Sequence, residues 1–259
     1  AVTIAIRELE EHYHISLFDR LNHRLYLTDA GRSFLEYAAR ISSLFADMEE
    51  EMSDMNEAGT LRVGASITIG TKYMPDYARQ FRDLHPDADL RVVIGPSEFL
   101  EAQLTKNELD LALVETDAHE KNLISKPYMD DFLTVITPPA APFQPNGSLT
   151  RQELSGQHFL LRERGSGTRE LFEKVIADEN ISVDIYWESV STAALICAVA
   201  RGLGISVLPG RLVQDAVAAG TVYEVSVPGL DFRRKFSIVQ HCDKHITKLM
   251  QDFLDIVVK

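Results

Sequence analysis

The stretch that decides the fold is FLLRERGSGTREL, residues 159–171. Its apolar start, residues 159–161, is long enough for a buried strand. Gly165-Ser166-Gly167 forms a flexible turn whose backbone can approach a ligand closely. Thr168 can cap a helix that begins at Arg169. A strand, a glycine-rich turn and a helix in this order are typical of an α/β fold.

The same turn is a candidate anion site. Free N–H groups and the positive end of the helix dipole meet at a helix start. Arg162, Arg164 and Arg169 add positive charge nearby. No Gly-Lys-Ser/Thr follows, so the turn is not a Walker loop. From these residues alone, an ordinary strand–helix turn with solvated arginines remains the alternative.

The composition indicates a globular chain of about two domains. Of the 259 residues, 45% are apolar and 25% charged, and the apolar residues form no run long enough to span a membrane. The start of the chain is charged within seven residues and does not resemble a signal peptide. Cys197 and Cys242 lie far apart, which favours a reducing compartment over a disulfide framework.

The net charge of −13 argues against nucleic acid as a partner, but the charge is unevenly distributed. Residues 1–32 hold four Arg and five acidic residues, so this part is nearly balanced. Most of the acid of the first segment lies in DMEEEMSDMNE, residues 47–57.

Residues 1–27 predict a helix followed by a β-hairpin. Apolar residues at helical spacing mark the helix over residues 1–13, and two short extended runs in residues 15–27 flank a basic tip. Arg20, His23 and Arg24 at this tip are candidates for contacts with phosphates. A solvated hairpin is the alternative that these residues alone favour.

Residues 28–56 predict a long helix that Thr28 caps. Its length of about 40 Å and its narrow heptad seam call for a partner helix, and a second copy of the chain is the first candidate. The alternative is a helix that lies on its own domain. The seam residues expected to mediate dimerisation are Phe34, Ala38, Ile41, Phe45, Met48 and Met52.

From residue 61 onward strands alternate with helices, which predicts a parallel sheet. Ser66, Thr68, Ser97 and Glu98 follow strand ends, where ligands bind in such sheets. The Pro-rich segment 137–142 predicts a crossing into a second subdomain. That subdomain would contain residues 159–171 and a helix, TAALICAVAR, which is apolar nearly all round and therefore expected to be buried together with Cys197.

Several of these segments resemble the LysR-type transcriptional regulators. IRELEEHYHISLFDRLNHRLYLTDAGRSFL, residues 6–35, is similar to the second half of the family's winged helix-turn-helix. LRVGAS at residues 61–66, ELDLAL at 108–113 and VARGLGISVLP at 199–209 continue the resemblance. The family's first helix and the front of its helix-turn-helix are absent from this sequence.

The resemblance implies an α/β fold with a two-lobed, periplasmic-binding-protein-like effector domain of type 2. A partial winged helix-turn-helix and a long linker helix would precede it. The expected divisions are a DNA-binding part at 1–27, a linker and dimerisation helix at 28–58, subdomain I at 61–136 and 237–259, and subdomain II at 137–236.

The function that the resemblance implies is that of a cytoplasmic regulator gated by a small effector bound between the two lobes. Its partners would be double-stranded promoter DNA, a second copy of the chain, often as a dimer of dimers, and RNA polymerase, with no membrane. Thr3 and Arg7 would lie on the recognition helix, with Arg20, His23 and Arg24 on the wing. The alternative is a solute-binding protein of the periplasmic type, which would leave the hairpin and the heptad helix without a role.

The effector is expected to be an anion, because this sequence looks most like the branch that regulates carbon-dioxide fixation and sulfur assimilation. The expected binding residues come from strand ends and helix starts: Ser66, Thr68, Ser97, Glu98, Arg164, Gly165, Ser166, Gly167, Thr168, Arg169 and Thr192. Arg164 or Arg169 would balance the charge. We expect no cofactor, no metal and no catalytic residue, since no enzyme motif occurs and His241 and His245 are interpreted as surface histidines.

Overall fold

The computed structural model describes residues 2–21, 24–57 and 59–258, with the backbone alone at 20–21, 24 and 46–57. The chain forms two compact units, an N-terminal unit of residues 1–57 and a C-terminal unit of residues 58–259. No helix among the described residues is long and apolar enough to cross a membrane.

The N-terminal unit contains the predicted helix, hairpin and long helix: α1 (Val2–Tyr13), β1 (Phe18–Leu21), β2 (Arg24–Leu27) and α2 (Asp29–Glu57). The hairpin is antiparallel, with Phe18 opposite Leu27. The Thr28 hydroxyl accepts the N–H of Gly31 at 2.9 Å, as expected for the residue that caps α2. The same hydroxyl donates to the carbonyl of Ser16 at 2.7 Å, so the cap also joins the hairpin to the helix.

The C-terminal unit alternates strands with helices, as the pattern predicts. Its elements in chain order are β3 (Thr60–Ala65), α3 (Ile67–Lys72), α4 (Met74–Leu84), β4 (Asp89–Ile94), α5 (Ser97–Thr105), β5 (Leu111–Val114), β6 (Leu123–Thr137), β7 (Gly147–Ser148), α6 (Arg151–Ser155), β8 (His158–Arg162), α7 (Gly167–Asp178), β9 (Asp184–Ser189), α8 (Thr192–Ala200), β10 (Ser206–Pro209), α9 (Gly210–Ala218), β11 (Tyr223–Ser226), β12 (Arg233–His241) and α10 (Lys248–Val258).

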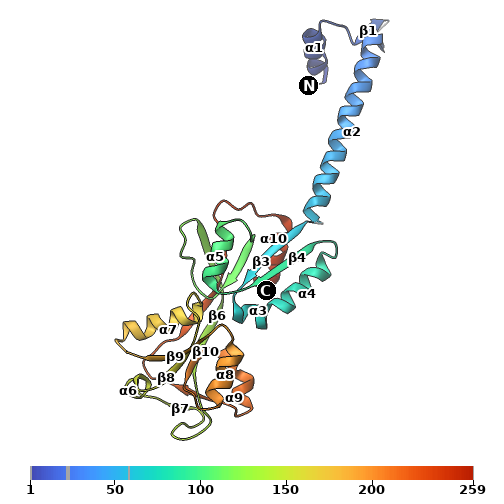
Figure 1. Cartoon of the computed structure of the whole chain (residues 1–259). Coiled ribbons are helices and arrows are strands. Elements are labelled where there is room, and N and C mark those ends of the chain that lie inside the picture. Colours follow the sequence, from blue (N-terminus) through green and yellow to red (C-terminus); the bar gives the residue numbers. More distant parts are fainter. Residues whose placement is uncertain (1, 22–23, 58, 259) are drawn as a thin grey trace. The chain divides into compact units, whose positions relative to one another are not determined.

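The strands form a mixed sheet in the order β4-β3-β5-β12-β6-β11-β7, with β10 also paired to β6. β3 pairs in parallel with β4 and β5, whereas β12 runs antiparallel to β5 and β6. β8 pairs with β9 and reaches β10 through a bridge between Phe159 and Ile205. The two long strands β6 and β12 therefore connect two lobes (Figure 1).

Lobe I, residues 59–129 and 236–258, has helices on both faces of its sheet. Leu111 and Leu113 of β5 belong to the core beneath α4 and α10, whereas Ala112 and Val114 face α5. This alternation follows from the two-residue period of a strand, and helices on both faces explain why all of β5 is apolar and buried.

Lobe II, residues 133–232, repeats this arrangement. Phe159 and Leu161 of β8 pack in the cluster that contains Phe172 of α7, whereas Leu160 packs with α8 and α9. The stretch 159–171 thus forms a buried strand and a helix start, as predicted.

The structure corrects two expectations. The lobes exchange within β6, because Leu133 and Val135 already pack in the lobe II core, so the boundary expected at 136/137 lies earlier. Cys197 is exposed, because α8 buries one face against lobe II and leaves the face with Cys197 open.

A substitution at Phe81 tests the assignment of the lobe I core. The ring of Phe81 is 0% exposed and lies edge-on to Phe253, with ring centroids 5.7 Å apart. We expect Phe81→Ala to lower the free energy of unfolding by about 3–5 kcal/mol through cavity formation, measured by denaturant titration. Leu84→Ala, on the same helix but 57% exposed, should cost less than about 0.5 kcal/mol. Equal losses in both variants would contradict the core assignment.

Candidate functional site

The cleft between the lobes is built from strand ends of lobe I and helix starts of lobe II. Ser66 follows β3 and Glu115 follows β5, while Thr168 lies in the first turn of α7. Arg234 lies on β12 where that strand crosses between the lobes. These side chains are buried, although all of them are polar or charged.

The carboxylate of Glu115 lies at the centre of this group. Its Oε1 accepts the hydroxyl of Ser66 at 3.1 Å and the N–H of Thr68 at 3.2 Å. Its Oε2 accepts the hydroxyl of Thr168 at 3.1 Å and Nη1 of Arg234 at 2.9 Å. We call these four donors the cradle. Residues of both lobes and of a crossing strand therefore converge on one negative charge.

Glu115 is ionised in this setting. Burial favours the neutral acid, but Arg234 and the hydroxyl donors outweigh it and hold the pKa of Glu115 below its ordinary value. The side chains of Glu115 and Arg234 are 3% and 5% exposed. A buried charge pair of this kind requires both partners, because removal of either leaves an uncompensated charge.

Several buried donors at the cradle are unused. Nη2 of Arg234 and the hydroxyls of Thr68, Ser97 and Thr116 have no hydrogen-bond partner within the described part of the chain. Nε of Arg234 donates to Asp131 at 2.8 Å, so only one edge of the guanidinium is free. Buried polar groups are normally satisfied, and these donors therefore mark capacity for a further acceptor.

The glycine-rich turn brings lobe II close to lobe I. A Cβ on Gly167 would lie 2.8 Å from Cγ2 of Thr116 and 3.1 Å from Cβ of Glu115, so only glycine fits. Gly165 has a φ of +82°, which other residues rarely adopt. Ser166 occupies the N-cap position of α7, whose first helical residue is Gly167. The expected cap, Thr168, lies inside the helix, where its hydroxyl donates to Glu115.

Thr192 lies at the start of α8 and connects to the cleft through a buried arginine. Its hydroxyl accepts Nη1 of Arg162 at 3.4 Å. Arg162 also pairs with Glu163 at 2.8 Å, and its charge contributes to the lowered pKa of Glu115. Arg162 is 1% exposed, so its side chain lies in the protein interior at the end of β8.

The charge expected to balance the anion comes from a different residue. Arg169 donates to Glu173 at 2.7 Å and also pairs with Glu188 on β9, and Arg164 is exposed. Neither reaches the cradle, where Arg234 supplies the positive charge. Glu98 also turns away and lines an outer cavity of about 790 Å³ with Arg164.

His119 joins the lobes at this outer cavity. Its Nδ1 lies 3.0 Å from Glu101 on α5 of lobe I, and its Nε2 lies 2.9 Å from Glu170 on α7 of lobe II. Glu170 and Glu101 raise the pKa of His119 to about 9. The imidazole is therefore charged at neutral pH and attracts a carboxylate of each lobe.

A second cavity reaches the cradle from outside. It has a volume of about 480 Å³, and Glu115 and Arg234 form part of its lining. Lys174, Arg233 and Lys235 also line it. Asp117 and Glu170 line it as well, but the basic side chains outnumber them, which favours entry of an anion.

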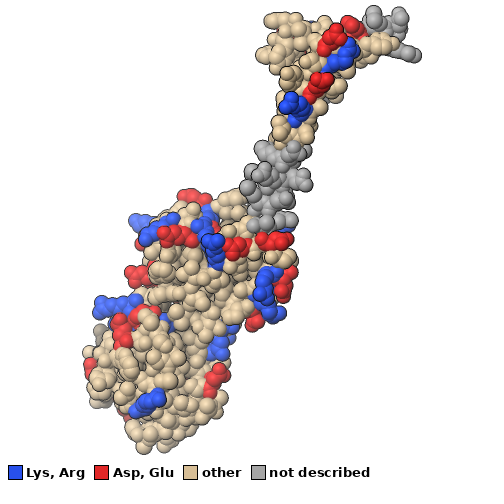
Figure 2. Space-filling view, turned by 45° about the vertical axis from the view of Figure 1, so that its right-hand side comes forward, with Lys and Arg blue, Asp and Glu red and all other residues tan. Residues whose placement is uncertain are grey.

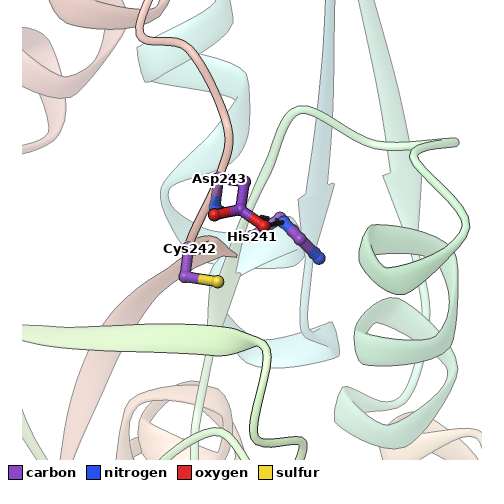
Figure 3. Close-up of side chains that lie close together, drawn as sticks. All are labelled: His241, Cys242 and Asp243. Carbon is purple, nitrogen blue, oxygen red and sulfur yellow. Dashed lines mark hydrogen bonds and ion pairs between the residues drawn. The ribbon is translucent and has the colours of Figure 1, made fainter.

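His241, Cys242 and Asp243 form a group whose potential ligand atoms lie within 4.8 Å of one another. They are consecutive residues where β12 ends, and Figure 3 shows their side chains. Nδ1 of His241 already accepts the N–H of Asp243 at 3.2 Å. A structural zinc site has four ligands, whereas this group offers three, two of them on exposed residues, so we assign no metal to it.

The residues expected to contact DNA lie on the N-terminal unit. Thr3 and Arg7 are exposed on α1, where Nε of Arg7 pairs with Glu11 at 2.8 Å. His23 lies outside the described residues, and the side chains of Arg20 and Arg24 also lie outside the described part. Acidic and basic residues intermingle on the face of the described residues that Figure 2 shows.

The described part of the seam on α2 is exposed apart from its beginning. Ile41 and Phe45 are 68% and 57% exposed, while Phe34 and Ala38 are half-buried. With Tyr13 these residues line an apolar groove of about 720 Å³. The side chains of Met48 and Met52 lie outside the described part of the chain.

The C-terminal unit and the last residues of α2 match a known family. The model of the LysR substrate binding domain matches residues 55–259. The HTH-type transcriptional regulator YeiE of Escherichia coli is 31% identical over 255 residues, which cover 98% of this chain and 86% of that protein. This chain belongs to the LysR family. It is a transcriptional regulator with an effector-binding domain, so the family, the fold class and the regulator function expected from the sequence are confirmed.

Further relatives agree with this assignment. The RuBisCO operon transcriptional regulator of Allochromatium vinosum is 27% identical over 260 residues and covers 100% of this chain and 86% of its own length. The regulatory domain of CcmR from Synechocystis, solved in complex with 2-PG, has a TM-score of 0.71 at 24% identity, covering 77% of this chain and 96% of its own. A full-length OxyR variant from Pseudomonas aeruginosa has a TM-score of 0.73 at 21% identity and covers 99% and 88%. The LysR fold is thus established.

The bridge at His119 predicts a pH-dependent stability. Because the folded-state pKa lies above the ordinary value of 6.5, the stabilisation is fully present below about pH 6.5 and is lost as the pH rises through about 9. We expect His119→Gln to melt at a lower temperature than the wild type at pH 6–7, with the difference vanishing near pH 10. The exposed His245→Gln should show no such trend in the same calorimetric series. A pH-independent deficit of His119→Gln would contradict the bridge.

Proposed function

We propose that this LysR-family chain acts in the cytoplasm as a DNA-binding regulator gated by a small anion between lobes I and II. The convergence of Ser66, Thr68, Thr168 and Arg234 on one carboxylate supports this proposal. Hydroxyls, a backbone N–H and a guanidinium are all donors, and such a set binds an anion better than a neutral ligand.

The position of the cradle fits a ligand that controls the relative arrangement of the two lobes. Ser66 and Thr68 belong to lobe I and Thr168 to lobe II, so an anion here contacts both. Two similar structures hold small ligands, 2-PG in CcmR and shikimate in the effector binding domain of QuiR. A ligand that contacts both lobes can shift their arrangement by its differential affinity for the two states.

The family assignment argues against the alternative, a solute-binding protein of the periplasmic type. The similarity to regulators covers 98% of the chain, including α1 and the hairpin, for which a solute-binding protein has no use. We infer no catalytic activity, since the relatives are transcriptional regulators. Thr3 and Arg7 on α1, with Arg20, His23 and Arg24 of the hairpin, are the residues we assign to promoter DNA, and RNA polymerase is a further expected partner.

We infer that a homodimer forms through the seam of α2, with a dimer of dimers as the larger assembly. Ile41 and Phe45 are apolar and exposed on a helix of 29 residues. Exposed apolar surface of this kind indicates an interaction site. A second copy of α2 presents the same seam, so the two seams would bury each other's apolar side chains symmetrically.

The C-terminal unit has apolar surfaces of its own for such an assembly. Val93 and Ile94 on β4 and Tyr186 and Trp187 on β9 are exposed at strands with a free edge. Such edges are normally covered or charged in a monomer. The face of α8 that carries exposed Cys197 is also apolar and open, which fits a role in assembly.

The anion proposal is tested by thermal stabilisation against sulfite, sulfate, phosphate and small carboxylates. A ligand at 100 times its dissociation constant should stabilise the protein by about 2.7 kcal/mol. Thr168→Val removes one donor and should weaken binding of the active anion by about 1.5–3 kcal/mol. Thr71→Val, an exposed threonine on α3, serves as the control and should bind normally. Unchanged affinity in Thr168→Val would place the site elsewhere.

The dimer proposal is tested at Ile41. Ile41→Glu places two like charges opposite each other in a paired seam and should raise the dimer dissociation constant at least about tenfold, roughly 1.4 kcal/mol. Sedimentation equilibrium measures this dissociation constant directly. Ser43→Glu adds the same charge away from the seam and should leave association unchanged. Equal effects of both substitutions would show that α2 does not pair through this face.

A further inference from the structure

Glu115 occupies the place that an external anion would need. We propose that Glu115 is an internal anion that keeps the cradle filled, so that the effector and the Glu115 carboxylate compete for the same donors. Glu115 would then determine which anions bind and how tightly. This inference deepens the proposed function, and for its meaning in regulation it rests on an effector that binds in the cradle.

The hydrogen bonds show that the donors cannot serve two anions at once. Both oxygens of Glu115 are engaged, Oε1 by Ser66 and the N–H of Thr68, Oε2 by Thr168 and Arg234. A second anion within reach of these donors would lie against the carboxylate, and like charges in a buried site repel strongly. The carboxylate must leave the donors before another anion takes them.

The cradle offers more than Glu115 uses. Nη2 of Arg234 and Oγ of Ser97 are buried without a partner among the described residues. The Arg234 side chain is only 5% exposed, so water does not readily satisfy it. A two-oxygen carboxylate leaves these donors idle, whereas a larger oxyanion could engage them in addition to the donors that it takes over. This difference would favour the external anion over Glu115.

The neighbouring cavity provides a route and a place for the displaced side chain. Glu115 and Arg234 line it, together with Lys174, Arg233 and Lys235, and these basic side chains outnumber the acidic Asp117 and Glu170. An incoming anion meets positive side chains before it reaches the cradle. A carboxylate that swings out of the cradle can be stabilised by the same side chains, because the cavity of about 480 Å³ has room for it.

Removal of the internal anion should create a site for a free carboxylate. Glu115→Ala leaves buried Arg234 with only one of its two carboxylate partners, Asp131, so the variant should melt at a lower temperature than the wild type. Sodium formate at constant ionic strength should raise the melting temperature of Glu115→Ala saturably and restore at least half of the loss. The wild type, whose cradle is filled, should show no saturable response to formate.

Two variants make this result specific. Glu101→Ala removes another buried glutamate of lobe I that pairs with exposed His119, and formate should not rescue it. Adding Thr168→Val to Glu115→Ala should weaken the formate response at least tenfold. If Glu115→Ala is unfolded in buffer, the same titration is followed as recovery of folded protein by circular dichroism. Failure of formate to stabilise or refold Glu115→Ala, or equal rescue of Glu101→Ala, would overturn the proposal.

The experiments distinguish failure of the internal-anion proposal from failure of the proposed anionic effector. An anion response of the wild type that Thr168→Val weakens, without formate rescue of Glu115→Ala, would retain the effector site and refute the internal anion. Formate rescue of Glu115→Ala without any wild-type response to the anion panel would retain the internal anion and refute the anionic effector.

Discussion

A buried carboxylate and a buried guanidinium have to remain paired, and this requirement organises the cleft of the C-terminal unit. Arg234 pairs with Glu115 at 2.9 Å and with Asp131 at 2.8 Å, and the side chains of both carboxylates are at most 3% exposed. Loss of one partner of a buried pair typically costs about 3–5 kcal/mol. Arg211 at the start of α9 reaches Asp131 from lobe II, so a chain of charges runs from lobe I through both crossing strands into lobe II.

Local sequence signals were sufficient for most of the elements and for some residues on both sides of the cleft. The apolar run before Gly165 is the strand β8, and the turn leads directly into α7. Such signals act within a few residues, which is why the helix starts with Ser66, Thr68 and Thr168 could be placed at a cleft. Glu115 and Arg234 are 119 residues apart, and they meet because β12 pairs with β5. No short-range pattern contains that strand pairing, so the centre of the cradle could not be predicted.

The expectations that failed have physical causes visible in the structure. Arg169 was expected to face the anion, but Glu173 lies four residues further along the same helix and is its natural partner. The apolar helix α8 was expected to be buried all round, yet a helix in the outer layer of a lobe can cover only one face. Apolar character on the remaining face is a signal of assembly, which a single chain cannot show. The exchange of lobes within β6 was missed because its proline-rich exit was the stronger signal.

Two of the contacts between the lobes differ in their relation to the cradle. His119 bridges Glu101 and Glu170 without using any donor of the cradle. Glu115 bridges the lobes inside through Thr168, and this contact changes when another anion takes the donors. A ligand can shift a conformational equilibrium only by the difference in its free energy of binding to the two states. An anion that merely reproduced the contacts of Glu115 would therefore leave the lobes where they are. An effector that changes the regulator has to gain from contacts that Glu115 does not make, and buried donors available for them are the free edge of Arg234 and the hydroxyls of Thr68, Ser97 and Thr116.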